Sequence, residues 1–261
     1  MIDIEVDPRG VATLTLGRPE KHNALSQAMI DALSGAAQTI AKSRDIRVVV
    51  LAGKGKSFCA GGDLGWMQDQ MAADDAQKRA AALSIARMLG AINELPQPVI
   101  GRVHGNTFGG GVGLACVCDM VVAADHARFG LTETRLGLIP ATIGPHVAAR
   151  MGPAATRRVF MSSRVFDADE ACALGIVGKV VAEAALDDAV AAEVLPYLQC
   201  APGAVAAAKA HARSLGPKTD AETINASIDA LITQWNSFEA EEGISAFFDK
   251  RPPHWAPKTD G

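Results

Sequence analysis

Two glycine-rich segments hold the residues best suited to chemistry in this chain. Residues 58–64 read Phe-Cys-Ala-Gly-Gly-Asp-Leu, and residues 104–111 read His-Gly-Asn-Thr-Phe-Gly-Gly-Gly. A glycine-rich turn before a helix leaves backbone N–H groups without partners, and the missing Cβ atoms let a ligand approach them closely. If the two turns follow adjacent strands, N–H groups around Gly62 and in the second turn can point at one oxygen, as in an oxyanion hole.

The elements that must position these turns are apolar runs. Residues 47–52 and 98–103 each precede a glycine-rich turn, and both are typical of strands buried on two faces. Residues 112–117 predict a short buried helix, and Asp63 is placed to cap the helix that begins at residue 64. Ligands of such sheets bind at the carboxyl ends of parallel strands, where both turns lie.

The rest of the chain alternates strands and helices, so we expect an α/β fold with a parallel sheet. A hairpin is predicted from 2–6 and 11–16, and further strands from 120–124, 128–130 and 178–181. Ser26 is a plausible N-cap for a helix to residue 43, and another helix is predicted from 74 to 95. The remaining predicted helices span 144–151, 153–162, 167–174, 183–199, 202–214, 219–236 and 239–249.

Composition narrows the function classes. The 261 residues are 49% hydrophobic and carry 25 basic and 29 acidic side chains, for a net charge of −4, with only 5% aromatic residues. These values favour a folded protein with a sizeable core and give no support for a nucleic-acid partner. No apolar segment has the length of a membrane span. Five cysteines behind an acidic N-terminus lead us to expect a reduced, cytoplasmic protein.

Four motifs, in order, resemble the enoyl-CoA hydratase/isomerase (crotonase) superfamily. They are Arg-Pro-x-x-x-Asn-Ala-Leu at 18–25, the segment 58–64, Gly-x-x-Phe-Gly-Gly-Gly at 105–111, and Phe-Gly-x-x-Glu at 129–133 with Gly-Leu-Ile-Pro at 137–140. Residues 243–251 also resemble the family's C-terminal helix. The resemblance spans nearly the whole chain, and bacterial methylglutaconyl-CoA hydratases are closest in pattern.

The resemblance implies a crotonase-like spiral of β-β-α units over residues 1–199, and a helical trimerisation region over 200–261. It implies an acyl-CoA thioester ligand, a homotrimer or hexamer (a dimer of trimers), and neither a metal nor another cofactor. The oxyanion-hole N–H groups are assigned to Gly62 and Gly110, and the catalytic carboxylate to Glu133. We expect no nucleic-acid or membrane partner.

Residues within or beside the matched motifs are the expected substrate contacts. They are Lys21, His22, Ala24, Ala60, Asp63, Leu64, Trp66, Gly109, Gly113, Thr132 and Leu138. Candidate partners for the CoA phosphates are the basic residues Arg18, Lys21, Lys54, Lys56, Lys250 and Arg251. His104 is expected to be structural, Asp119 to cap or pair locally, and His146 to lie at the surface or at a helix end.

The chain departs from the family pattern at one position. Family hydratases usually hold the attacking water between two glutamates, and the first would stand at position 113, where this chain has glycine. One reading is hydration with Glu133 alone, in which Gly113 makes room for a branched or carboxylated acyl group. The alternatives are an isomerase that uses Glu133 as its only base, a protein that binds acyl-CoA with little catalysis, or another crotonase reaction such as thioester hydrolysis.

Overall fold

A six-stranded sheet forms the centre of the protein, in a computed structural model that describes residues 1–257. Its order is β1-β2-β3-β5-β7-β10, and only β1 and β2 run antiparallel. The strands are β1 (Ile2–Val6), β2 (Val11–Leu16), β3 (Val48–Gly53), β5 (Val99–Val103), β7 (Met120–Ala124) and β10 (Lys179–Val181). The predicted hairpin and parallel core are confirmed.

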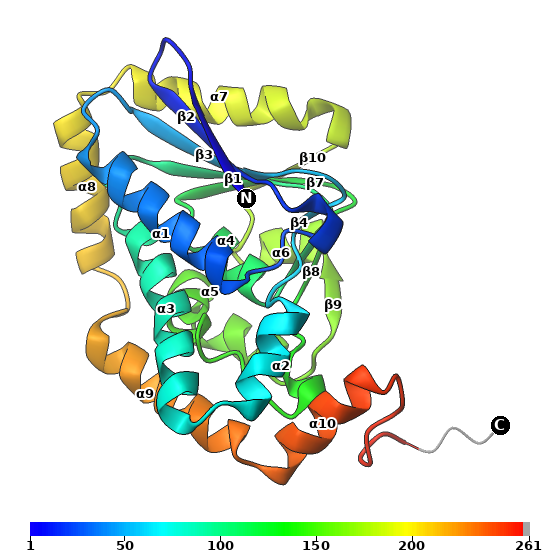
Figure 1. Cartoon of the computed structure of the whole chain (residues 1–261). Helices are drawn as coiled ribbons and strands as arrows, with labels where there is room; N and C mark the ends of the chain where they lie inside the picture. Colours follow the sequence, from blue (N-terminus) through cyan, green and yellow to red (C-terminus); the bar gives the residue numbers. More distant parts are fainter. Residues whose placement is uncertain (258–261) are drawn as a thin grey trace.

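Helices cover both faces of this sheet. Figure 1 shows α7 (Leu186–Leu198) lying across one face, and α1 (Gln27–Lys42), α3 (Asp75–Asn93) and α4 (Gly110–Cys116) pack on the other. Successive side chains of a strand point to opposite faces, so Val48 and Val50 pack towards α7, whereas Val49 and Leu51 join the larger core. The prediction of strands buried on two faces is confirmed.

A second sheet of short strands lies beside the first. It contains β4 (Ser57–Cys59), β6 (Asn106–Phe108), β8 (Arg128–Gly130) and β9 (Val165–Asp167), in that order. Three times, a long strand of the first sheet is followed by a short strand of the second: β3 by β4, β5 by β6 and β7 by β8. This repetition is the expected spiral, and it places both glycine-rich turns at the ends of short strands.

The remaining elements surround this core. They are η1 (Pro19–Lys21), α2 (Leu64–Ala72), η2 (Glu133–Leu136), α5 (Gly144–Phe160), α6 (Ala168–Ala173), η3 (Glu183–Ala185), α8 (Pro202–Ser214), α9 (Ala221–Trp235) and α10 (Phe238–Phe248). Helix α5 is broken at Gly152, where φ is +75°, so it matches the two helices expected there. The last helices return to the core: α9 passes beside α3 (Figure 1) and also packs on α5, and α10 packs on η2.

Several predictions concern the chain as a whole. The division at residue 199 stays a prediction, and residues 258–261 of its second part lie outside the described residues. Within residues 1–257 no single helix is long and apolar enough to span a membrane. One pair of segments, Glu183–Leu198 and Pro202–Ser214, reaches the required length and composition when taken together, but the two are bent by 105° relative to each other. No group of three or more potential metal ligands gathers in the described part of the chain.

Candidate active site

The two glycine-rich turns lie against each other, as predicted. Strands β4 and β6 pair in parallel, which brings the ends of both strands to the same edge. A Cβ atom built on Gly61 would lie 3.0 Å from the carbonyl oxygen of Phe108 and 3.6 Å from the backbone nitrogen of Gly110. The φ angle of Gly61 is +93°, a conformation that L side chains rarely adopt. Glycine is therefore required where the two turns meet.

Gly62 and Gly110 present unused N–H groups at this junction. Within residues 1–257 neither N–H has a backbone or side-chain acceptor. Gly62 is exposed and Gly110 is partly exposed, so a ligand can reach both. Helix α4 begins at Gly110, two residues before the predicted start, so the Gly110 N–H also lies at the positive end of a helix dipole. Both groups are suited to stabilising negative charge on an oxygen.

Leu25 fixes the spacing of the two turns. Its backbone N–H donates to the Gly61 carbonyl at 2.8 Å, and its carbonyl accepts from the Asp63 N–H at 3.1 Å. Its side chain fills the space beside Gly110, where a Cβ atom would come within 2.6 Å of Leu25 Cδ1. We did not single out this residue from sequence, although it ends the matched motif at 18–25. That position in the motif was the available signal.

Glu133 places its carboxylate beside the second turn. It is the first residue of η2, and a Cβ atom on Gly109 would lie 3.1 Å from Glu133 Oε1. Although the residue as a whole is partly exposed, Oε2 is buried without a hydrogen-bond partner. Burial raises the pKa of Glu133 to about 7, against a smaller opposing effect of its own backbone N–H. A carboxylate with that pKa can both accept and return a proton near neutral pH.

The surroundings of Gly113 correct one expectation. A Cβ atom there would lie 2.6 Å from Ile143 Cγ2, 3.0 Å from Ile143 Cβ and 3.3 Å from Leu89 Cδ1. Aliphatic side chains therefore occupy the space that was expected to accommodate a bulky acyl group, so that part of the prediction is wrong. Within residues 1–257 neither a second carboxylate nor His146 is among the nearest neighbours of this place, so Glu133 remains the one candidate for the catalytic carboxylate.

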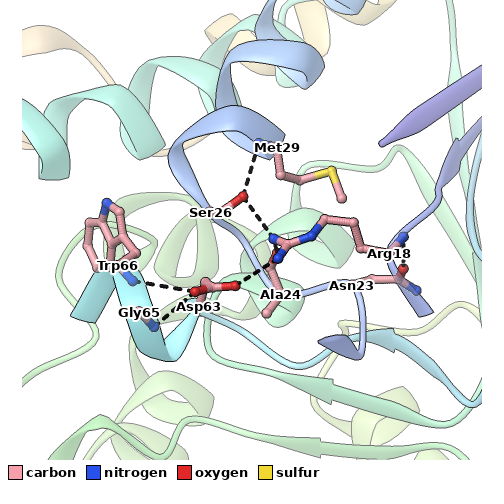
Figure 2. A network of polar contacts seen from close by, with 8 residues as sticks. All are labelled: Arg18, Asn23, Ala24, Ser26, Met29, Asp63, Gly65 and Trp66. Atoms are coloured by element: carbon pink, nitrogen blue, oxygen red, sulfur yellow. Dashed lines mark hydrogen bonds and ion pairs between the residues drawn. The ribbon is translucent and has the colours of Figure 1, made fainter. Parts of the chain in front are cut away.

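Asp63 links the first turn to helix α2 and to Arg18, as Figure 2 shows. Its Oδ1 accepts from the N–H of Gly65 at 2.9 Å and from that of Trp66 at 3.4 Å, so it caps α2 as predicted. Its Oδ2 pairs with Arg18 at 3.1 Å. Trp66 lies close to the turn, because a Cβ atom on Gly62 would be 3.9 Å from its ring. Trp66 is thus placed beside Gly62, one of the two predicted oxyanion donors.

The other predicted contacts are spread around the same junction. His22 Nδ1 lies 3.1 Å from Ser57 Oγ, and the Ala60 N–H donates to the His22 carbonyl. Leu64 is half exposed, whereas Ala24 is buried. Thr132 precedes Glu133 without capping η2, and Leu138 packs under α10. Their roles in substrate binding stay predictions.

The basic residues separate into two groups. Arg18 is held inside the network of Figure 2, Arg251 makes a bidentate pair with Glu242, and Lys54 pairs with Asp3. These three have acidic partners within the chain, and their phosphate contacts stay predictions. Lys21, Lys56 and Lys250 are exposed, and within residues 1–257 none of them has an acidic partner. They are the better candidates for a CoA phosphate.

Three further polar residues lie outside the site. His104 is buried and its Nε2 contacts the Gly55 carbonyl at 2.8 Å, as expected of a structural residue. Asp119 accepts from the Val99 N–H and pairs with Lys209, which is the local role expected. His146 lies in the first turn of α5, at a helix end as expected, but it is buried. It lines a cavity of about 870 Å³ at the far end of α4 from Gly110. Burial lowers the pKa of His146 to about 4.

Comparison with known sequences places this geometry in a family. Residues 7–258 match the sequence profile of the enoyl-CoA hydratase/isomerase family. An enoyl-CoA hydratase of Alternaria alternata is 33% identical over 91% of this chain and 78% of its own length. The mitochondrial methylglutaconyl-CoA hydratase of Mus musculus is 31% identical over 97% of this chain and 81% of its own length.

Solved structures agree with the sequence comparison. The crystal structure of an enoyl-CoA hydratase from Mycobacterium smegmatis superposes with a TM-score of 0.79 at 38% identity, covering 97% of this chain and 98% of the other. The crystal structure of an enoyl-CoA hydratase from Mycobacterium avium superposes with a TM-score of 0.85 at 30% identity, covering 98% of each chain. The similarity therefore extends over nearly the whole chain.

Proposed function

Because the chain belongs to the enoyl-CoA hydratase/isomerase family, we propose that it adds water across the α,β double bond of an enoyl-CoA with Glu133 as its only catalytic carboxylate. The observation that supports this proposal is the position of Glu133 Oε1 against Gly109, next to the free N–H of Gly110. The base and the oxyanion donors thus flank one small region, as the reaction requires.

The reaction proceeds in two proton transfers. Glu133 accepts a proton from water while the water oxygen forms a bond to the β-carbon, and the electron pair of the double bond moves onto the thioester as an enolate. The N–H groups of Gly62 and Gly110 stabilise the enolate oxygen, each by about 3 kcal/mol. Protonated Glu133 then returns the proton to the α-carbon. The product gains one hydroxyl group and one hydrogen, and the carboxylate is regenerated.

The filled space beside Gly113 also favours a second candidate function. Moving a double bond requires one base that takes a proton from the α-carbon of a β,γ-enoyl-CoA and returns it to the γ-carbon. Glu133 alone can do this, and the place at which a second glutamate would hold water is filled by the buried side chains of Ile143 and Leu89. The isomerase is therefore the alternative, followed by a protein that binds acyl-CoA with little catalysis.

Substrate and assembly complete the proposal. A branched or carboxylated acyl group, as in methylglutaconyl-CoA, is supported by the name of the Mus musculus relative. We further propose a homotrimer or hexamer, a cytoplasmic location, and activity without a metal or cofactor, since CoA is part of the substrate. The net charge of −4 gives no support for nucleic acid as a partner.

The test is the Glu133→Gln variant with a panel of straight, branched and carboxylated enoyl-CoAs. Glutamine keeps the shape but cannot accept the proton, so kcat should fall by roughly 10²- to 10⁴-fold, followed as loss of the conjugated-enoyl absorbance. Glu222→Gln, on the exposed start of α9, is the matched control and should leave kcat unchanged. Unchanged hydration by Glu133→Gln contradicts the proposal. Conversion of a β,γ-enoyl-CoA to a conjugated product, without hydration, supports the isomerase.

A further inference from the structure

We infer that Arg18 is a positioning residue that holds the Gly62 N–H in its catalytic orientation by acting through Asp63. The inference rests on the proposed function, because it assumes that Gly62 is an oxyanion donor. It assigns to the guanidinium a task that differs from the phosphate contact expected of a basic residue beside an acyl-CoA site.

The contacts of Arg18 are internal and engage both of its terminal nitrogens. Nη1 donates to Ser26 Oγ at 2.8 Å and to the Ala24 carbonyl at 3.3 Å, and Nη2 pairs with Asp63 Oδ2 at 3.1 Å (Figure 2). The side chains of Arg18 and Asp63 are only 19% and 16% exposed, so solvent screens this ion pair less than a surface pair. The guanidinium therefore ties the start of α1 to the cap of α2.

Arg18 itself is anchored in a rigid loop. Its N–H donates to Asn23 Oδ1, and the Asn23 amide donates to the carbonyls of Lys54 and Ser57. Asn23 is fully buried and, like His22, has a positive φ, which an L residue keeps only when its surroundings enforce it. The loop is thus a fixed support from which Arg18 reaches Asp63.

Gly62 has no such support of its own. Its N–H makes no bond within the described chain, and neither it nor Gly61 has a Cβ atom to restrict the backbone. The direction of its N–H is therefore set by its neighbours, through the backbone bonds of Leu25 to Gly61 and Asp63 and through the Arg18–Asp63 pair. Loss of Arg18 releases Asp63 Oδ2 while Oδ1 still caps α2, so the helix remains and the turn loosens.

The predicted effect is on the transition state rather than on CoA binding. Loss of an oxyanion donor costs about 10²–10³-fold in kcat, and a misplaced donor retains part of that contribution. For Arg18→Gln we expect a fall in kcat of about 10- to 100-fold with KM nearly unchanged. Asp63→Asn keeps the cap of α2 but weakens the pair, so we expect a similar fall in kcat. Arg9→Gln, which breaks the exposed pair with Asp7, is the matched control and should have no effect.

Bound acetoacetyl-CoA gives a second readout, since its β-keto thioester ionises to an absorbing enolate when oxyanion donors stabilise it. Arg18→Gln should lower the enolate fraction of bound probe, and Arg18→Lys should lower it less, because one ammonium can reach only part of the guanidinium's contacts. Circular dichroism confirms that the variants are folded. Should Arg18→Gln not fold, Arg18→Lys and Asp63→Asn carry the test.

Wild-type kcat and enolate fraction in these variants would overturn the inference and leave the proposed function intact. A rise in KM alone would also overturn it, by returning Arg18 to CoA binding. If the wild-type protein neither hydrates nor isomerises enoyl-CoAs and binds acetoacetyl-CoA without forming enolate, the proposed function fails as well. The two failures are therefore distinguishable.

Discussion

At the scale of single residues, Glu133 has one buried carboxylate oxygen, although the residue as a whole is partly exposed to solvent. Its buried Oε2 has no partner within residues 1–257, and its Oε1 lies beside Gly109 in the second glycine-rich turn. A carboxyl group in ordinary surroundings would be a weak base at neutral pH. Removing water from it raises its proton affinity, and the pKa of about 7 makes one residue suitable both for taking and for returning a proton.

The pH dependence of catalysis follows from this pKa. In the proposed mechanism the ionised form of Glu133 is the base, so kcat/KM for hydration should rise about tenfold per pH unit below pH 7 and level off above about pH 8. Initial rates with an enoyl-CoA between pH 5.5 and 8.5 measure the profile. His146 is outside the site and has a pKa of about 4, so it does not produce this inflection. A flat profile, or one that falls above pH 7, would show that ionised Glu133 is not the base.

At the scale of elements, the sequence predicts secondary structure well where a regular spacing of apolar residues extends over several turns of helix. The helix at Gln27–Lys42 with its Ser26 cap and the helix at Pro202–Ser214 follow from residue type and spacing alone. The strands at Ser57–Cys59, Asn106–Phe108 and Val165–Asp167 were missed, because each has three residues and gains its extended form from pairing with distant strands. The motif predicted the neighbouring turns without predicting the strands that carry them.

The packing between α4 and the start of α5 shows a contact that local sequence patterns cannot predict. The glycine at position 113 suggested free space, but Ile143 lies thirty residues further along the chain and only tertiary packing brings its side chain there. Likewise, the resemblance assigned Gly62 and Gly110 as donors, but it did not reveal that Leu25 and Arg18 hold the turn between them. The candidate residues were thus available from sequence, and the contacts that position them were not.

Substitution at Gly113 tests this packing. Gly113→Ala places a Cβ atom 2.6 Å from Ile143 Cγ2, and such overpacking should lower the free energy of unfolding by about 1–3 kcal/mol, less any gain in helix propensity. Ile143→Leu removes the branch at Cβ, so the double variant should lose less stability than the sum of the two single changes. Urea unfolding measures each variant.

Gly35→Ala is the matched control for Gly113→Ala. Gly35 is also inside a helix, α1, but a Cβ atom there meets nothing within 4 Å. Alanine should therefore raise the free energy of unfolding, by up to about 1 kcal/mol. If Gly113→Ala is as stabilising as Gly35→Ala, the close packing of Ile143 on Gly113 is refuted.

At the scale of the whole molecule, the same burial that tunes Glu133 also affects stability. Helix α10 packs on η2, which begins at Glu133, so the C-terminal part of the chain supports the segment that carries the carboxyl group. The folded state therefore holds a proton on Glu133 up to about pH 7, whereas the unfolded chain releases it near pH 4.5. Between these values the folded state binds more protons, so the free energy of unfolding falls as pH rises.

This linkage gives a signed prediction for Glu133→Gln. Above pH 7 the ionised carboxylate costs the parent fold roughly 3 kcal/mol, since each pKa unit corresponds to about 1.4 kcal/mol. Glutamine carries no charge in either state, so the variant should be more stable than the parent, and its advantage should grow by about 2 kcal/mol between pH 5 and pH 8. Thermal and urea unfolding at one fixed protein concentration measure it, with Glu222→Gln showing no such trend. An advantage that does not change with pH would mean that Glu133 is ionised alike in both states, and the basis for its role as a tuned base would be lost.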